Sequence, residues 1–160
     1  MSVAELSRER VAERLTGLQE SYDSFPVDQT TLSVATEAYD KARERCRGGL
    51  VDAHVQVSNG DGDVLLVDRD GDWVVPRAEP GAGRRLETGA QQAVRERTGV
   101  ECSVTGLRRV TILGVRDVDD PERPPVYRLV AVFTAEYVAG SPAEDSEWHA
   151  DLPESALPGY

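Results

Sequence analysis

Lysine is almost absent from this chain. The 160 residues include 18 basic and 29 acidic side chains, and Lys41 is the only lysine. The formal net charge of −11 repels nucleic-acid backbones, so we expect no binding to duplex nucleic acid. An excess of carboxylates with little lysine favours a halophilic protein, because molar salt screens repulsion between charges over very short distances. The alternative is a GC-rich genome that favours arginine, aspartate, glycine and alanine codons.

Cysteine and long apolar runs are also scarce. The two cysteines, Cys46 and Cys102, share no spacing motif, and we expect free thiols in a reducing cytoplasm. No apolar run approaches the roughly 20 residues that span a bilayer, so we expect no membrane insertion. The N-terminus, MSVAELSRERVAERL, has no apolar core of a secretory signal. These features predict a cytoplasmic domain with its own core.

Residues 1–49 read as a helical N-terminal arm. Ser2 and Glu5 have capping-box spacing, and an apolar stripe follows at mostly helical intervals, formed by Val3, Leu6, Val11, Leu15 and Leu18. After Pro26, a second helix is expected at roughly 29–46, ending before a glycine pair. The apolar stripe must be buried, so we expect the arm to pack on the main domain or to form a homodimer.

Residues 50–160 form the second predicted unit. The apolar period changes to two, and residues 51–76 predict three strands joined by turns rich in glycine and aspartate. A helix is expected to begin near Gly89, after a Thr88–Gln91 capping box, and to end at Gly99. Strands follow at 102–118 and 127–138, and then a short final helix. The order predicts a mixed α/β fold with a mostly antiparallel sheet.

The segment GAGRRLETGAQQAVRERTGV carries the main motif. Gly81, Glu87, Arg95 and Glu96 have the spacing G-x5-E-x7-R-E, and W-x-x-P precedes them at 73–76. The segment resembles the Nudix hydrolase family, whose box is G-x5-E-x7-R-E-U-x-E-E-x-G-U, where U is aliphatic. The resemblance covers residues 50–160 and implies a Nudix-like α/β/α sandwich, with the N-terminal arm outside it.

The end of this box is shortened. After Glu96 the chain has only Arg97-Thr98-Gly99-Val100, three residues fewer than the family pattern, and the glutamate pair is missing. An alignment from the other end matches Gly99 and Val100, makes Glu96 the first glutamate of the pair and puts Arg97 in place of the second. Either alignment leaves one carboxylate where E-x-x-E-E would place three on one helix face.

The resemblance assigns roles to the residues that remain. It implies that Glu96 is the metal ligand or base, assisted by Glu87 and the Gly81 carbonyl, while Arg95 orients the carboxylates. The implied metal is Mg²⁺ or Mn²⁺. The implied reaction is hydrolysis of a nucleoside diphosphate linked to another moiety, with a metal-activated water attacking phosphorus. The alternative is an inactive Nudix-fold module that binds a nucleotide or regulates a partner, and the missing glutamate pair favours it.

Three arginines flank the box in an otherwise acidic chain. They are Arg77, Arg84 and Arg85. Guanidinium groups bind phosphate well, because their planar N–H donors match its oxygens, and we therefore expect these residues to bind a nucleotide-like substrate. Charge balance with neighbouring carboxylates is the alternative explanation.

The acidic composition leads to a prediction about salt. If the composition is salt adaptation, the melting temperature should rise as KCl is raised from millimolar to molar concentration, because repulsion between carboxylates is then screened. Thermal unfolding followed by circular dichroism measures this effect. A flat or falling melting temperature would favour the codon-bias explanation.

Overall fold

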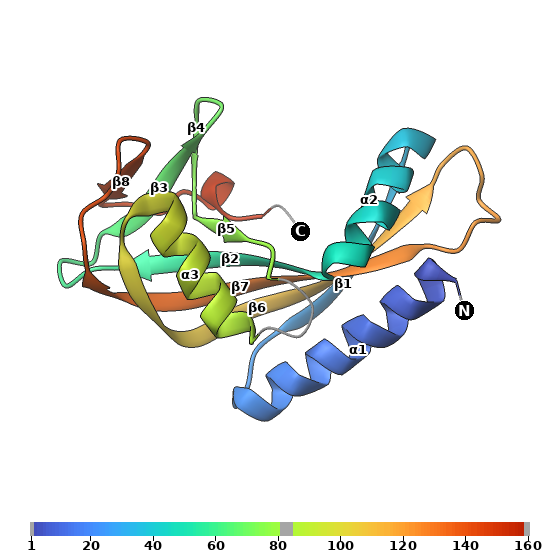
Figure 1. Cartoon of the computed structure of the whole chain (residues 1–160), viewed down its shortest axis with the longest axis horizontal. Coiled ribbons are helices and arrows are strands. Elements are labelled where there is room, and N and C mark those ends of the chain that lie inside the picture. The colour runs from blue at the N-terminus through green and yellow to red at the C-terminus, as the bar shows by residue number, and fades with distance from the viewer. Residues whose placement is uncertain (1, 81–84, 159–160) are drawn as a thin grey trace.

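The computed structural model describes residues 2–80 and 85–158 (Figure 1). The helices are α1 (Val3–Ser21), α2 (Thr36–Gly48), α3 (Leu86–Thr98) and a short 3-10 helix, η1 (Glu154–Ala156). The strands are β1 (Val27–Val34), β2 (Val51–Ser58), β3 (Val64–Arg69), β4 (Asp72–Val74), β5 (Arg77–Ala78), β6 (Glu101–Asp117), β7 (Val126–Ala139) and β8 (Ser146–His149). None of the helices in these described segments is long and apolar enough to cross a membrane.

The strands form one mixed sheet in the order β1-β6-β7-β2-β3-β4, with β5 paired to β2 and β8 paired to β3. The β1–β6 and β2–β7 pairs are parallel, and the other pairs are antiparallel. The prediction of a mixed α/β fold with mostly antiparallel pairing is therefore confirmed. Neither parallel pair joins strands that are consecutive in the sequence, because a short hairpin can join only antiparallel strands.

Helices cover both faces of the sheet. The ring of Tyr22, which follows α1, lies 6.2 Å from the ring of Phe133 on β7. Phe133 is paired in register with Val55 on β2, so the α1 side of the sheet is the Val55 side. Side chains alternate along a strand, and on the other side Asp52 reaches Arg45 of α2. Figure 1 shows α1 and α2 on opposite sides of the strands, as expected of an α/β/α sandwich.

The N-terminal arm shares its core with the rest of the chain. Val11 and Leu18 of α1 and Tyr39 of α2 are buried in the same apolar cluster as Phe133. Ser2 caps α1 as predicted, because its side chain accepts the N–H of Glu5. The predicted packing of the arm against the main domain is observed.

The predicted helix at 29–46 is partly wrong. Residues 27–34 form strand β1, and α2 begins only at Thr36. Two adjacent β-branched residues, Thr30 and Thr31, favour extended backbone, and Pro26 disfavours helix at its predecessor. Pairing with β6 along eight residues further stabilises the strand. The predicted final helix is also reduced to the three residues of η1.

A buried carboxylate holds several of these elements together. Asp52 Oδ1 accepts hydrogen bonds from Arg45 (2.9 Å), Arg77 (2.9 Å) and Arg128 (3.0 Å), and Oδ2 accepts a second bond from Arg128 (3.1 Å). Burial alone would raise the pKa of Asp52, but the bonds from Arg128 and Arg77 outweigh burial and lower it. Glu79 bonds Arg45 and Arg77 from the outside. The cluster joins β2, β5, β7 and α2.

Removal of the Asp52 charge should destabilise the fold. Asp52→Asn keeps the shape but leaves the buried guanidinium of Arg128 without its counter-charge, so we expect a loss of about 3–5 kcal/mol in the free energy of unfolding. Urea unfolding measures it. The control is Glu37→Gln, which removes an exposed carboxylate paired with Lys41 and should leave stability nearly unchanged. Equal stability of the two variants would contradict a structural role for the cluster.

Candidate functional site

Helix α3, which carries the box, begins earlier than predicted. It starts at Leu86 and not near Gly89, so the predicted capping box of Thr88 and Gln91 is wrong. The side-chain oxygen of Gln91 instead accepts the N–H of Val104 on β6, at 2.9 Å. Leu86 is buried, and its burial favours a helix that begins at this residue. The predicted C-cap at Gly99 is confirmed, with a left-handed φ of 77°.

The earlier start separates the two candidate carboxylates. Glu87 lies in the first turn of α3 and Glu96 near its end, nine residues apart in one continuous helix. At 1.5 Å and 100° per residue, they lie roughly 13 Å apart along the axis and point to opposite sides. Glu87 is a hydrogen-bond partner of Tyr22, and burial followed by this contact raises the pKa of Tyr22. Glu96 accepts a 3.0 Å bond from Gln92.

The described residues on α3 do not fit a divalent metal. Mg²⁺ takes an octahedral shell of oxygen atoms at close range, and Glu87 and Glu96 do not converge on one point. Within 2–80 and 85–158, no three His, Cys, Asp or Glu side chains gather in a group that could hold a metal. Gly81, whose carbonyl was the third expected ligand, lies outside the described residues.

The arginines of the motif are dispersed. Arg95 is exposed, and its Nε lies 3.8 Å from an oxygen of Glu101 rather than beside Glu87 or Glu96. Arg85 is also exposed and pairs loosely with Glu87, at 4.0 Å. Arg77 lies in the Asp52 cluster, and Arg84 lies outside the described residues. The structure therefore separates Arg77 from Arg85, which lines a different cavity next to α1.

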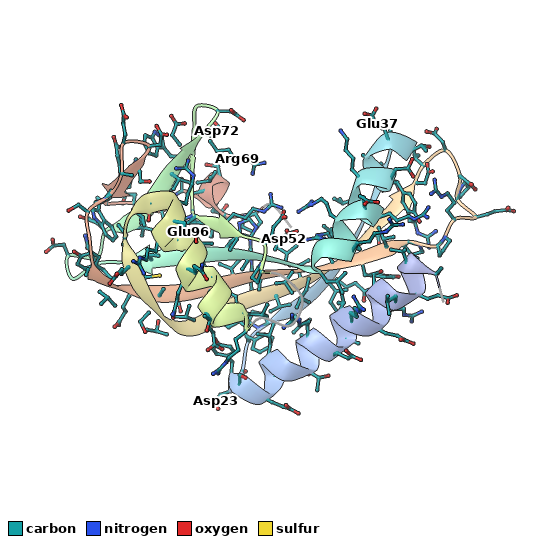
Figure 2. All side chains as sticks on the ribbon, viewed as in Figure 1. Asp23, Glu37, Asp52, Arg69, Asp72 and Glu96 are labelled. Atoms are coloured by element: carbon teal, nitrogen blue, oxygen red, sulfur yellow. The ribbon has the colours of Figure 1, made fainter. Side chains whose placement is uncertain are left out.

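A cavity of about 490 Å³ gathers several cationic side chains. Arg69 comes from the end of β3, Arg77 from β5 and Arg97 from the last turn of α3, and all three line the cavity. The guanidinium of Arg97 donates to the backbone carbonyl of Asp68 at 3.3 Å, which directs it toward β3. Figure 2 labels Arg69 near the β3–β4 turn and Asp52 near the start of β2. This clustering of arginines contrasts with the net charge of −11.

Part of the cavity lining is apolar and close to the C-terminus. The lining side chains there come from β3, β4 and the segment around η1, and they are Val67, Val74, Val75, Ala156, Leu157 and Pro158. The N–H of Val75 donates to the carbonyl of Ala156 at 3.0 Å, which holds the C-terminal segment in place. The size and the mixed lining match ordinary small-molecule sites, in which a few polar groups orient a ligand against apolar walls.

His54 lies at the cationic side of this cavity. Burial lowers the pKa of His54 to about 4, and the positive charge of Arg77 is the next largest cause. Asp52 acts in the opposite direction, and Arg109 and Arg69 lower the pKa by smaller amounts. Its imidazole is therefore neutral at pH 7. Arg109 donates to the carbonyl of Pro158 at 2.6 Å, while its buried Nε has no hydrogen-bond partner among the described residues.

The sequence interpretation missed most of this cavity. Of the basic side chains that line it, only Arg77 was predicted as a site residue. Arg97 could have been identified from the sequence, because it occupies the shortened end of the box, where the second alignment expects a glutamate. Arg69 could not have been found in this way, because it ends strand β3 and its position depends on how β3 and β4 pair.

Comparisons with known proteins find similarity in structure only. No protein-family model and no curated sequence matches the chain. Solved structures do match. A Nudix hydrolase from Nitrosomonas europaea is 17% identical, with 69% of this chain and 61% of that chain covered and a TM-score of 0.49. A UDP-X diphosphatase is 15% identical, with 94% and 84% covered and a TM-score of 0.48.

A third match is an ADP-ribose pyrophosphatase from Streptococcus suis, 15% identical, with 65% of this chain and 77% of that chain covered and a TM-score of 0.45. The chain resembles Nudix structures. At this identity and these scores the similarity concerns the path of the backbone, and the ligand of this Nudix-like domain has to be inferred from its own residues.

The lowered pKa of His54 predicts a pH dependence of stability. The unfolded imidazole has a pKa of about 6.5 and the folded one about 4, so between these values only the unfolded chain binds the proton. The contribution of His54 is therefore fully present above pH 6.5 and is lost as the pH falls toward 4, by about 2–3 kcal/mol. Urea unfolding at pH 7 and pH 4.5 should show a shallower acid decline for His54→Asn than for the parent. Parallel declines would contradict the buried neutral imidazole.

Proposed function

We propose that this Nudix-like domain binds a phosphorylated, nucleotide-like small molecule in the cavity of Arg69, Arg77 and Arg97, without hydrolysing it. The observation that carries the proposal is the convergence of three guanidinium groups, from three separate elements, on one cavity of a strongly acidic chain. Guanidinium groups bind phosphate oxygens in pairs of charge-assisted hydrogen bonds. The apolar wall formed by Val67, Val75 and Leu157 suits a base or another flat group.

The three arginines differ in how freely they can meet a ligand. Arg77 is already bonded to Asp52 and Glu79, so it contributes positive potential and a fixed position. The described partner of Arg97 is a neutral backbone carbonyl at 3.3 Å, a weak contact that a phosphate can replace. We therefore assign the main phosphate contact to Arg97, with Arg69 on the facing turn.

Binding without hydrolysis follows from the carboxylates. The proposed metal residues of the box, Glu87 and Glu96, lie at opposite ends and on opposite sides of α3. Glu79, a further carboxylate near the cavity, is bonded to Arg45 and Arg77. Among residues 2–80 and 85–158, no three His, Cys, Asp or Glu side chains gather in a group that could hold a metal.

A second candidate function is metal-dependent hydrolysis of a nucleoside diphosphate derivative. It is favoured by the spacing G-x5-E-x7-R-E from Gly81 to Glu96, which is complete in the sequence. For this function the Nudix resemblance assigns Mg²⁺ or Mn²⁺ binding to Glu96, Glu87 and the Gly81 carbonyl, orientation of the carboxylates to Arg95, and substrate binding to Arg77, Arg84 and Arg85. It would require an arrangement of Glu87 and Glu96 different from the one in α3.

We also propose that the protein works in the cytoplasm. Cys46 and Cys102 are both buried and unpaired, and burial raises the pKa of both thiols. Such thiols are typical of proteins kept in a reducing compartment.

Calorimetric titration with ADP tests the binding site. The parent should bind ADP, and Arg97→Gln should weaken binding about tenfold, because one charge-assisted contact is worth on the order of 1.4 kcal/mol. Arg8→Gln, at an exposed position of α1, is the matched control and should bind like the parent. The chain has two histidines, so the imidazole of His54 can be followed by NMR. Its pKa should rise with ADP, because the phosphates bring negative charge.

The same protein separates the two candidate functions. Under the first, no phosphate is released from ADP-ribose or another nucleoside diphosphate derivative with millimolar Mg²⁺ or Mn²⁺, while ADP still binds. Metal-dependent release that is lost in Glu96→Gln would instead establish the second. Absence of ADP binding, with no response of His54, would sink the proposed binding site.

A further inference from the structure

Strand β1 leaves one backbone edge free. It lies at the end of the sheet order and pairs only with β6, so no described strand occupies its outer side. Six of its eight residues are exposed, and the other two, Thr30 and Val34, are only half-buried. A row of unpaired N–H and C=O groups on a strand edge is a template for pairing with another chain.

The hydrogen bonds to β6 show which residues face outward. The N–H of Val110 donates to the carbonyl of Pro26 at 3.0 Å, and the N–H of Val118 donates to the carbonyl of Val34 at 2.8 Å. Backbone groups of successive strand residues point alternately to the two sides, so the even-numbered residues bond β6. The outward N–H and C=O groups therefore belong to Val27, Gln29, Thr31 and Ser33.

This edge lacks the devices that usually protect one. Edge strands are commonly blunted by lysine, proline, a bulge or very short length. The sequence of β1, VDQTTLSV, contains neither lysine nor proline. Its register with β6 runs without a shift from Val27 to Val34. Asp28 is its single charged residue, so eight straight residues are available for pairing.

Exposed apolar side chains also occur along this edge. Five large hydrophobic residues are exposed in the described structure, and Val27 (40%), Leu32 (36%) and Val118 (58%) are three of them. Val27 and Leu32 belong to β1, and Val118 bonds the carbonyl of Val34 at its end. A partner strand laid along β1 would cover apolar surface as well as backbone groups.

We propose that β1 pairs antiparallel with β1 of a second copy of this chain, forming a twofold dimer with a continuous sheet. The outward backbone groups belong to odd-numbered residues, so in an antiparallel pair odd-numbered residues of one copy face odd-numbered residues of the other. One residue then faces its own copy across the twofold axis, and near the middle of β1 this residue is Thr30 or Thr31. Asp28 then faces Leu32 of the partner subunit or Val34 of the partner subunit. Neither register brings the two aspartates opposite each other, which would be unfavourable.

The centre of the strand also favours a second copy. In either register a threonine faces the same threonine of the partner, and cross-strand threonine pairs stabilise antiparallel sheets. Each copy carries a net charge of −11, so dimerisation is opposed at long range by repulsion between the copies. Salt screens that repulsion, and the dimer becomes tighter as KCl rises.

Sedimentation equilibrium of the full chain in molar KCl tests the dimer. The parent should form a dimer, and Thr31→Pro should weaken it at least tenfold, because it removes an outward N–H without removing a bond to β6. Proline is tolerated on an edge strand when its missing N–H faces outward. Thr31→Ala, which keeps the N–H, is the matched control and should dimerise like the parent. Circular dichroism verifies that each variant is folded.

Disulfide trapping reads the register and does not depend on the proline variant. With the axis at Thr30, its two Cα atoms lie about 4.5 Å apart, within the range that a disulfide spans. With the axis at Thr31, the two Thr31 Cα atoms lie about 5.5 Å apart. Thr30→Cys or Thr31→Cys should therefore give a covalent dimer on mild oxidation, and Thr16→Cys, exposed on α1, should not.

Three results would overturn the proposal. One is a parent that stays monomeric in molar KCl at every concentration, which includes the case in which β1 pairs with a different protein. Another is a folded Thr31→Pro variant that dimerises as tightly as Thr31→Ala. The third is trapping at positions 30 and 31 that does not exceed trapping at position 16.

Discussion

The bonds around Asp52 are the constraint on which the rest of the domain depends. A carboxylate that is 5% exposed can remain ionised only if donors surround it, and three arginines supply them. These donors come from α2, β5 and β7, so burial of one charge fixes the relative positions of elements that are far apart in the sequence. Displacement of any one of these elements would remove a donor from the buried carboxylate, which is energetically costly.

The same cluster shapes the candidate site. Arg77 is held by Asp52 and Glu79, and it lies beside His54, whose pKa burial and the surrounding arginines lower. Positive charge is therefore fixed at one side of the cavity, and the imidazole there stays neutral. An anionic ligand would relieve the repulsion among these groups. The Asp52 cluster, which joins the strands, therefore also holds Arg77 at the cavity.

Helix α3 carries the segment that resembles a shortened Nudix box. The box keeps its first glutamate and its R-E pair, but it loses the pair of carboxylates that would share a face with Glu96. The helix also extends back to Leu86, so Glu87 becomes part of it and points away from Glu96. In the alignment made from the other end of the box, Arg97 stands in place of the second glutamate, and its guanidinium lines the cavity. The segment that ends α3 therefore lacks the glutamate pair and contributes the positive charge of Arg97 to the cavity.

Much of the fold could be predicted from local patterns. The alternation of apolar residues in 51–76 and 127–138, the cap at Ser2 and the terminator at Gly99 all act over a few residues, and each was read correctly. The strand at 27–34 was not, because its main stabilisation is pairing with β6, some eighty positions later. The start of α3 was also misplaced, because burial of Leu86 outweighs a local capping signal. Contacts between distant residues leave no periodic trace in the sequence.

The candidate site divides in the same way. The sequence by itself determined the charge of the chain, the shortened box and the presence of Arg77 and Arg97. Only the tertiary structure decided that Arg97 shares a cavity with Arg69 and His54, and that Glu87 and Glu96 do not share a metal. Residue types and spacings fix which groups a segment carries, since helix geometry is local. Which groups meet depends on strand pairing and on the burial of Asp52, and these are decided only when the whole sheet assembles.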